Sequence, residues 1–75
     1  MTVPEALPFM QAVYDRHATG CCLHIVLDDG NIKNSHVEFC IKNALEQGHS
    51  DCLRAACILM LCSSTQRIKL GEKVR

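Results

Sequence analysis

Residues 35–62 read SHVEFCIKNALEQGHSDCLRAACILMLC, and their apolar side chains recur at helical spacing. Ser35 and Glu38 have the spacing of a capping box, which predicts a helix start at this point. Gly48 is the residue type that most often ends a helix, and Ser50 is a favoured N-cap for a second one. Two helices joined by so short a turn favour antiparallel neighbours, so this stretch predicts an all-α bundle.

The second helix of this pair is apolar nearly all round in its second half. Its helical spacing predicts an inner face made of Leu53, Ala56, Cys57, Met60 and Leu61. Further apolar residues lie off that face, at Ile58, Leu59 and Cys62. A helix that is apolar nearly all round is either central in its fold or meets a partner. Because a chain of 75 residues has little left to cover the second set, we expect a homo-oligomer.

Weaker signals on either side predict further helices. Thr2 and Glu5 have capping-box spacing ahead of an apolar face, and Gly20 is expected to end that helix. Ser63 begins a similar box, and Gly71 is expected to end the last helix. The fold prediction is therefore a single domain with three to four short helices. The domain covers residues 1–75, and its helices cover about residues 8–17, 35–47, 51–62 and 65–70.

The segment around residues 21–31 is ambiguous. Leu23, Ile25 and Val26 have high β propensity, and the DDGN run at 28–31 is dense in turn-forming residues. No second strand follows to pair with it. We therefore expect an irregular or short-strand segment around residues 21–31, and for residues 21–27 a short helix or irregular turn is slightly favoured over a strand.

Charge and hydropathy bear on partners and location. Eight basic residues balance eight acidic ones, so the excess of Lys and Arg on which nucleic-acid binding depends is missing, and we do not expect a nucleic-acid partner. Residues 1–7 have neither the basic nor the apolar part of a signal peptide. The most apolar stretch, residues 55–62, is too short to span a bilayer. We expect a cytoplasmic protein with no membrane partner.

Six cysteines and four histidines are many for a chain of this length. Zinc prefers thiolate and imidazole ligands in a tetrahedral arrangement. Cys22, His24, His49 and Cys52 would form such a set if the segment before Asp28 met the turn between the two central helices. No Cys-x-x-Cys pair supports this set, and the alternative is that the cysteines, Cys57 and Cys62 among them, are small core residues. The sequence therefore leaves two alternatives for the cofactor, which are a zinc ion or no cofactor.

A second group of polar residues surrounds the ambiguous segment. It consists of His24, Asp28, Asp29, Asn31 and His36. Carboxylates beside an imidazole could bind a cation, a small ligand or a partner protein. The alternative is ordinary turn chemistry, in which these side chains cap backbone groups. No phosphate loop, nucleophile elbow or HExxH motif occurs, so no catalytic residue is predicted.

The run GCCLHIVLDDGN at residues 20–31 resembles a signature of small uncharacterised proteins encoded by bacteriophages and prophages. In those proteins it is similarly followed by a Phe-Cys helix, here Phe39-Cys40, and by a Gln-Arg pair, here Gln66-Arg67. The similarity covers roughly residues 13–70. It implies that the protein is encoded by a phage or prophage, but it implies no mechanism.

Two functional hypotheses follow. The first is a phage-type, non-enzymatic binding protein that docks on a protein in the host-cell cytoplasm, with a host defence system as one target. Neutral charge, small size and the over-apolar helix favour it. The second is a metal- or ligand-binding domain that uses the segment from His24 to His36 and the neighbouring cysteines.

Overall fold

The computed structural model describes residues 2–17, 22–29 and 33–75, which form five helices and no strand. These are α1 (Val3–Arg16), α2 (Cys22–Asp29), α3 (Asn34–Gln47), α4 (Ser50–Leu61) and α5 (Ser64–Val74). The all-α prediction is confirmed. The prediction of three to four helices is wrong, because the segment expected to be irregular or a short strand forms α2. None of the described helices is long and apolar enough to cross a membrane.

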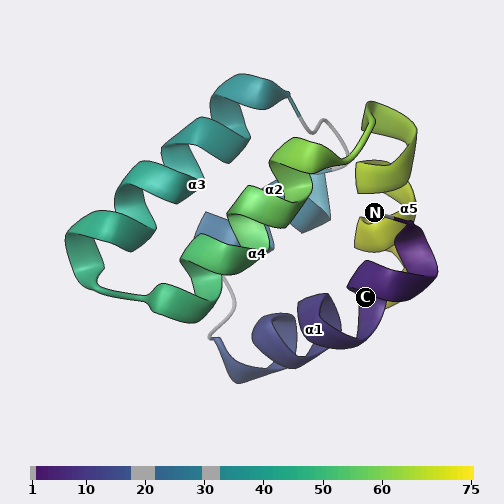
Figure 1. Ribbon diagram of the computed structural model, residues 1–75, viewed down its shortest axis with the longest axis horizontal. Helices are drawn as coiled ribbons and strands as arrows, with labels where there is room; N and C mark the ends of the chain where they lie inside the picture. Colours follow the sequence, from purple (N-terminus) through teal and green to yellow (C-terminus); the bar gives the residue numbers. More distant parts are fainter. Residues whose placement is uncertain (1, 18–21, 30–32) are drawn as a thin grey trace.

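Helix α2 lies at the centre of the molecule, behind α4 in Figure 1. It packs against α3, α4 and α5, and α1 packs against α4 and α5. Leu23, Val26 and Leu27 of α2 are buried. Tertiary burial of this kind overrides β propensity, which explains why residues with high strand preference form a helix here.

Helices α3 and α4 form the expected antiparallel pair (Figure 1). Gly48 joins them with φ 71°, a left-handed conformation that glycine adopts without steric cost, and its N–H closes the end of α3. The capping box predicted at Ser35 and the N-cap predicted at Ser50 are wrong. Helix α3 begins at Asn34 and α4 begins at Ser50, so Ser35 and Ser50 are already helical and neither serves as an N-cap.

The inner face of α4 is rotated from the predicted one. The buried residues are Cys52, Ala55, Ala56, Ile58 and Leu59, with Cys62 just after the helix. The predicted inner residues Cys57, Met60 and Leu61 are exposed. Because α3 covers one side of α4 while α1 and α2 cover another, a single chain buries the residues that were assigned to a partner subunit. Burial of Ile58, Leu59 and Cys62 within one chain therefore does not require a homo-oligomer.

Helix α1 begins at Val3, five residues before the predicted start near residue 8, and α5 begins at Ser64, close to the predicted start near residue 65. Both capping boxes, Thr2 with Glu5 and Ser63 with Gln66, are confirmed. Gly71 does not end α5, which continues to Val74. A Cβ at position 71 would overlap the carbonyl oxygen of Leu27, so this glycine permits close contact between α5 and α2. The proposed end of the first helix at Gly20 lies outside the described residues.

Candidate functional sites

His24, the histidine common to both predicted sites, is buried against α1. Its Nε2 lies 2.6 Å from the carbonyl oxygen of Tyr14, and the two rings stack with centroids 3.9 Å apart. Because a carbonyl oxygen only accepts hydrogen bonds, Nε2 carries a proton in this contact. His24 thus joins α2 to the end of α1.

Asp28 contacts the same tyrosine. The Tyr14 hydroxyl donates to Asp28 Oδ1 at 2.8 Å, and this hydrogen bond raises the pKa of Tyr14 above its ordinary value of 10.0. His24 and Asp28 are four residues apart, on one face of α2, and both bind Tyr14. Their observed contacts are therefore those of helix packing.

The rest of the predicted binding set is not gathered around His24 in the part of the chain that the structure describes. His36 is exposed on α3. Asn31 and the side chain of Asp29 lie outside the described portion. His36 instead lines a small apolar cleft between α2 and α3.

This cleft, which we call the Phe39 cleft, has a volume of about 80 Å³. It is lined by Ile25, Val26, His36 and Phe39. Ile25 is 56% exposed and Phe39 is 63% exposed, which is high for large apolar side chains. Sequence reasoning missed this cleft, although the Phe39-Cys40 pair was noted as part of the resemblance. The missing information was that α2 is a helix with Ile25 on its outer side.

The predicted zinc set is divided in the structure. His49 and Cys52 lie together, and His17 joins them, with one candidate ligand atom of each within 4.8 Å of the others. His24 is engaged with Tyr14 instead, and the side chain of Cys22 lies outside what the structure describes. Sequence reasoning missed His17 because it lies more than thirty residues before His49 and shares no ligand spacing with it.

His17 Nε2 is close to two groups of α4. It lies 3.2 Å from Cys52 Sγ and 3.0 Å from Asp51 Oδ2. The other carboxylate oxygen of Asp51 accepts the backbone N–H of Cys52 at 2.8 Å. The hydrogen bond from His17 is the main cause that lowers the pKa of Asp51, and Arg16 contributes at 3.8 Å. We call His17, His49 and Cys52 the His–Cys cluster, with Asp51 beside it.

The cluster does not have the geometry of a catalytic triad. In a triad the histidine contacts the nucleophile through one ring nitrogen and the carboxylate through the other. Here Nε2 of His17 makes both contacts, so no proton path leads from Cys52 through the ring to Asp51. The arrangement is better suited to ligation than to activation of a nucleophile.

The remaining described cysteines divide between core and surface. Cys40 and Cys62 are buried thiols, whereas Cys57 is exposed, contrary to the expectation that it belongs to the core.

Comparison of the chain with protein-family models, with curated proteins and with solved structures gives no match. The geometry of the molecule therefore carries the functional argument.

Proposed function

We propose that this chain is a small phage-type binding protein that docks on a host protein through the Phe39 cleft and thereby counters a host defence system. The observation that carries the proposal is the exposure of Ile25 and Phe39 on either side of an apolar cleft. The resemblance of residues 20–31 to phage and prophage proteins supports the host as the place where the partner is found.

The cleft favours an apolar anchor on the partner. Its volume of about 80 Å³ accepts part of one large apolar side chain. Burial of exposed aromatic and aliphatic groups contributes roughly 25 cal/mol for each Å² removed from water, and such groups commonly dominate binding energy. His36 also lines the cleft and is exposed, so a partner that covers the cleft would contact its imidazole. An amphipathic helix that inserts one apolar residue matches this surface.

The charge of the chain supports the same mode of binding. The formal net charge is zero, so long-range attraction contributes little to association. Binding that depends on apolar contact is only weakly reduced by salt. We expect the complex with the host protein to persist at high salt.

The test uses Phe39→Ala, with Leu61→Ala as the matched control. Leu61 is 73% exposed but does not line the cleft. Each variant is expressed in host cells and its partner is recovered at low and at high salt. We expect Phe39→Ala to lose a partner that Leu61→Ala retains. Equal recovery by both variants would contradict the proposal.

Self-association is tested with the same variants by sedimentation of the purified chain. We expect that the chain does not dimerise through the Phe39 cleft at micromolar concentration. A dimer that Phe39→Ala dissociates would show that another copy of the chain occupies the cleft, and the docking proposal would then be wrong.

A further inference from the structure

The His–Cys cluster supports an inference that is independent of the docking function. We propose that His17, His49 and Cys52 bind a zinc ion, with Asp51 as the fourth ligand. This set differs from the one expected from spacing, because His17 takes the place of His24 and Asp51 that of Cys22.

The ligand atoms of His17, His49 and Cys52 lie within 4.8 Å of one another, and one pair is already near the spacing of tetrahedral coordination. Zinc bonds of about 2.0 Å to nitrogen and 2.3 Å to sulfur place neighbouring ligand atoms roughly 3.3–3.7 Å apart. Cys52 Sγ and His17 Nε2 are separated by 3.2 Å. The His17 and His49 rings lie with centroids 5.5 Å apart and tilted by 52°, so they do not stack and each keeps its own ligand direction. Small side-chain shifts bring the three atoms onto one ion.

The backbone holds these side chains at a junction of helices. His17 is the C-cap of α1, His49 is the N-cap of α4, and Cys52 follows in the first turn of α4. His49 and Cys52 are three residues apart, which places them on the same side of that turn. The positive end of the α4 dipole also stabilises a thiolate at Cys52, the form in which cysteine binds metal.

Asp51 supplies the fourth ligand and balances charge. Its Oδ2 lies 3.0 Å from His17 Nε2, so the carboxylate is within reach of an ion bound to that nitrogen. When Nε2 binds zinc it loses its proton, so Asp51 can no longer accept a hydrogen bond from it and is left facing the ion. A thiolate and a carboxylate together neutralise the two charges of Zn²⁺.

The mixed nitrogen and sulfur donors favour zinc over calcium or magnesium, which prefer oxygen ligands. Side-chain burial is graded across the site. Cys52 is buried, His17 is half-buried and His49 is exposed. The ion can therefore enter from the His49 side. Zinc bound there would tie the end of α1 to the start of α4, two elements that no disulfide joins among the described cysteines.

The first experiment measures metal binding by the full chain, purified without a metal column and stripped with a chelator. Co²⁺ is added as a spectroscopic probe. We expect one equivalent to give the visible bands of a tetrahedral ion and the near-ultraviolet charge-transfer band of a thiolate ligand, and Zn²⁺ to displace it. Absence of both bands with the wild-type chain would overturn the proposal.

Variants identify the ligands. His49→Gln removes an exposed ligand, so the fold should be retained while cobalt affinity falls at least tenfold. Cys52→Ser should abolish the charge-transfer band, and Asp51→Asn should weaken binding roughly tenfold. The matched controls are His36→Gln and Cys57→Ser, which remove an exposed histidine and an exposed cysteine outside the cluster. Both controls should bind cobalt as the wild type does.

A stability measurement separates loss of a ligand from loss of fold. Zn²⁺ should raise the unfolding temperature of the wild-type chain progressively with concentration, because it binds only the folded state. His49→Gln should unfold at the wild-type temperature without metal and need at least tenfold more zinc for the same increase. If Cys57→Ser lost the cobalt spectrum while Cys52→Ser kept it, the assignment of the site would be wrong.

Discussion

The imidazole of His24 lies flat on the phenol ring of Tyr14, with 11° between the planes, and donates to the carbonyl oxygen of the same residue. That carbonyl belongs to the last turn of α1, where backbone oxygens have no partner within the helix. Arg67 Nε donates to the Leu59 oxygen at the end of α4, and Arg75 Nη1 donates to the Leu27 and Asp28 oxygens at the end of α2. Side chains from other helices thus close the ends of α1, α2 and α4.

Replacement of His24 by alanine should lower the free energy of unfolding. The variant leaves the Tyr14 carbonyl without its donor and removes the stacked ring, and an unpaired buried acceptor costs about 1–3 kcal/mol. His36→Ala, an exposed histidine, should change stability by no more than about 0.5 kcal/mol. Urea denaturation of both variants makes the comparison. Equal effects would show that the contact with Tyr14 contributes nothing.

The single tyrosine permits a direct test of its contact with Asp28. The hydrogen bond to Asp28 raises the pKa of Tyr14 in the folded chain, so this contact stabilises the fold fully below pH 10.0 and is lost as the pH rises through the higher folded value. Absorbance titration of the phenol should show a pKa above the ordinary one. In Asp28→Asn the pKa should fall toward that value, and an unchanged titration curve would refute the contact.

Gly71→Ala should destabilise the chain even though alanine is the better helix former. The added methyl group overlaps the backbone of Leu27, and overpacking of this kind costs about 1–3 kcal/mol. Gly48→Ala is the comparison, because no atom lies near its Cβ and only the left-handed backbone is strained, at about 1–2 kcal/mol. Thermal unfolding should show a lower midpoint for Gly71→Ala than for the wild-type chain. A more stable Gly71→Ala chain would disprove the close approach.

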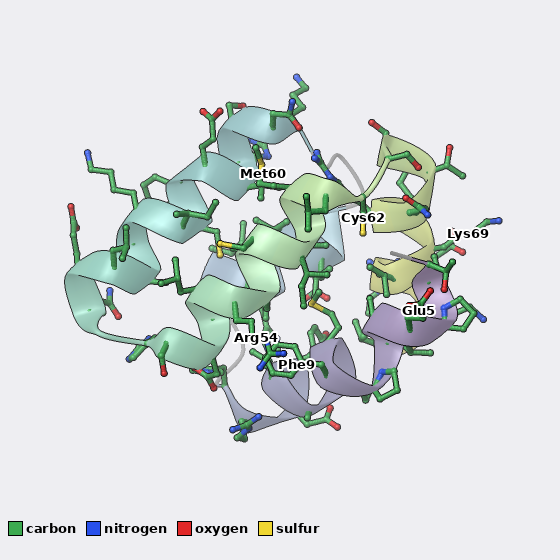
Figure 2. All side chains as sticks on the ribbon, in the orientation of Figure 1. Glu5, Phe9, Arg54, Met60, Cys62 and Lys69 are labelled. Atoms are coloured by element: carbon green, nitrogen blue, oxygen red, sulfur yellow. The ribbon has the colours of Figure 1, made fainter. Side chains whose placement is uncertain are left out.

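Arg67→Met should lower stability more than Lys69→Met, although both remove one positive charge from α5. Arg67 is 5% exposed and its Nε donates to the Leu59 oxygen at 2.7 Å, so its loss should cost about 1–3 kcal/mol. Lys69 points away from the bundle in Figure 2, and its replacement should be nearly neutral. Similar unfolding midpoints for the two variants would contradict the buried role of Arg67.

The sequence was informative where a signal is local. The boxes at Thr2 and Ser63 and the left-handed turn at Gly48 depend on a few adjacent residues, and all three are confirmed. The inner face of α4 was not predictable, because Ile58 and Leu61 are equally apolar and only their neighbours decide which is buried. Gly71 illustrates the same limit, since a glycine that permits close contact looks the same in sequence as one that ends a helix.

The candidate sites were partly predictable. His49 and Cys52 were selected from their spacing, and the structure brings them together. His17 could not be selected, because its approach to them depends on how α1 packs against α4. Nearby, Figure 2 shows Arg54 of α4 beside Phe9 of α1, with the guanidinium 4.9 Å from the ring centre, and this contact helps hold the two helices in that arrangement.

Helix α1 packs on α5, and Gln11 of the first helix donates a hydrogen bond to the Val74 oxygen of the last. The ribosome therefore releases the apolar side of α1 long before its covering surface has been synthesised. The buried residues Ala6, Met10 and Val13 stay accessible to water or to a chaperone during that interval. Burial of these side chains therefore waits until α5 has been synthesised and packs on α1.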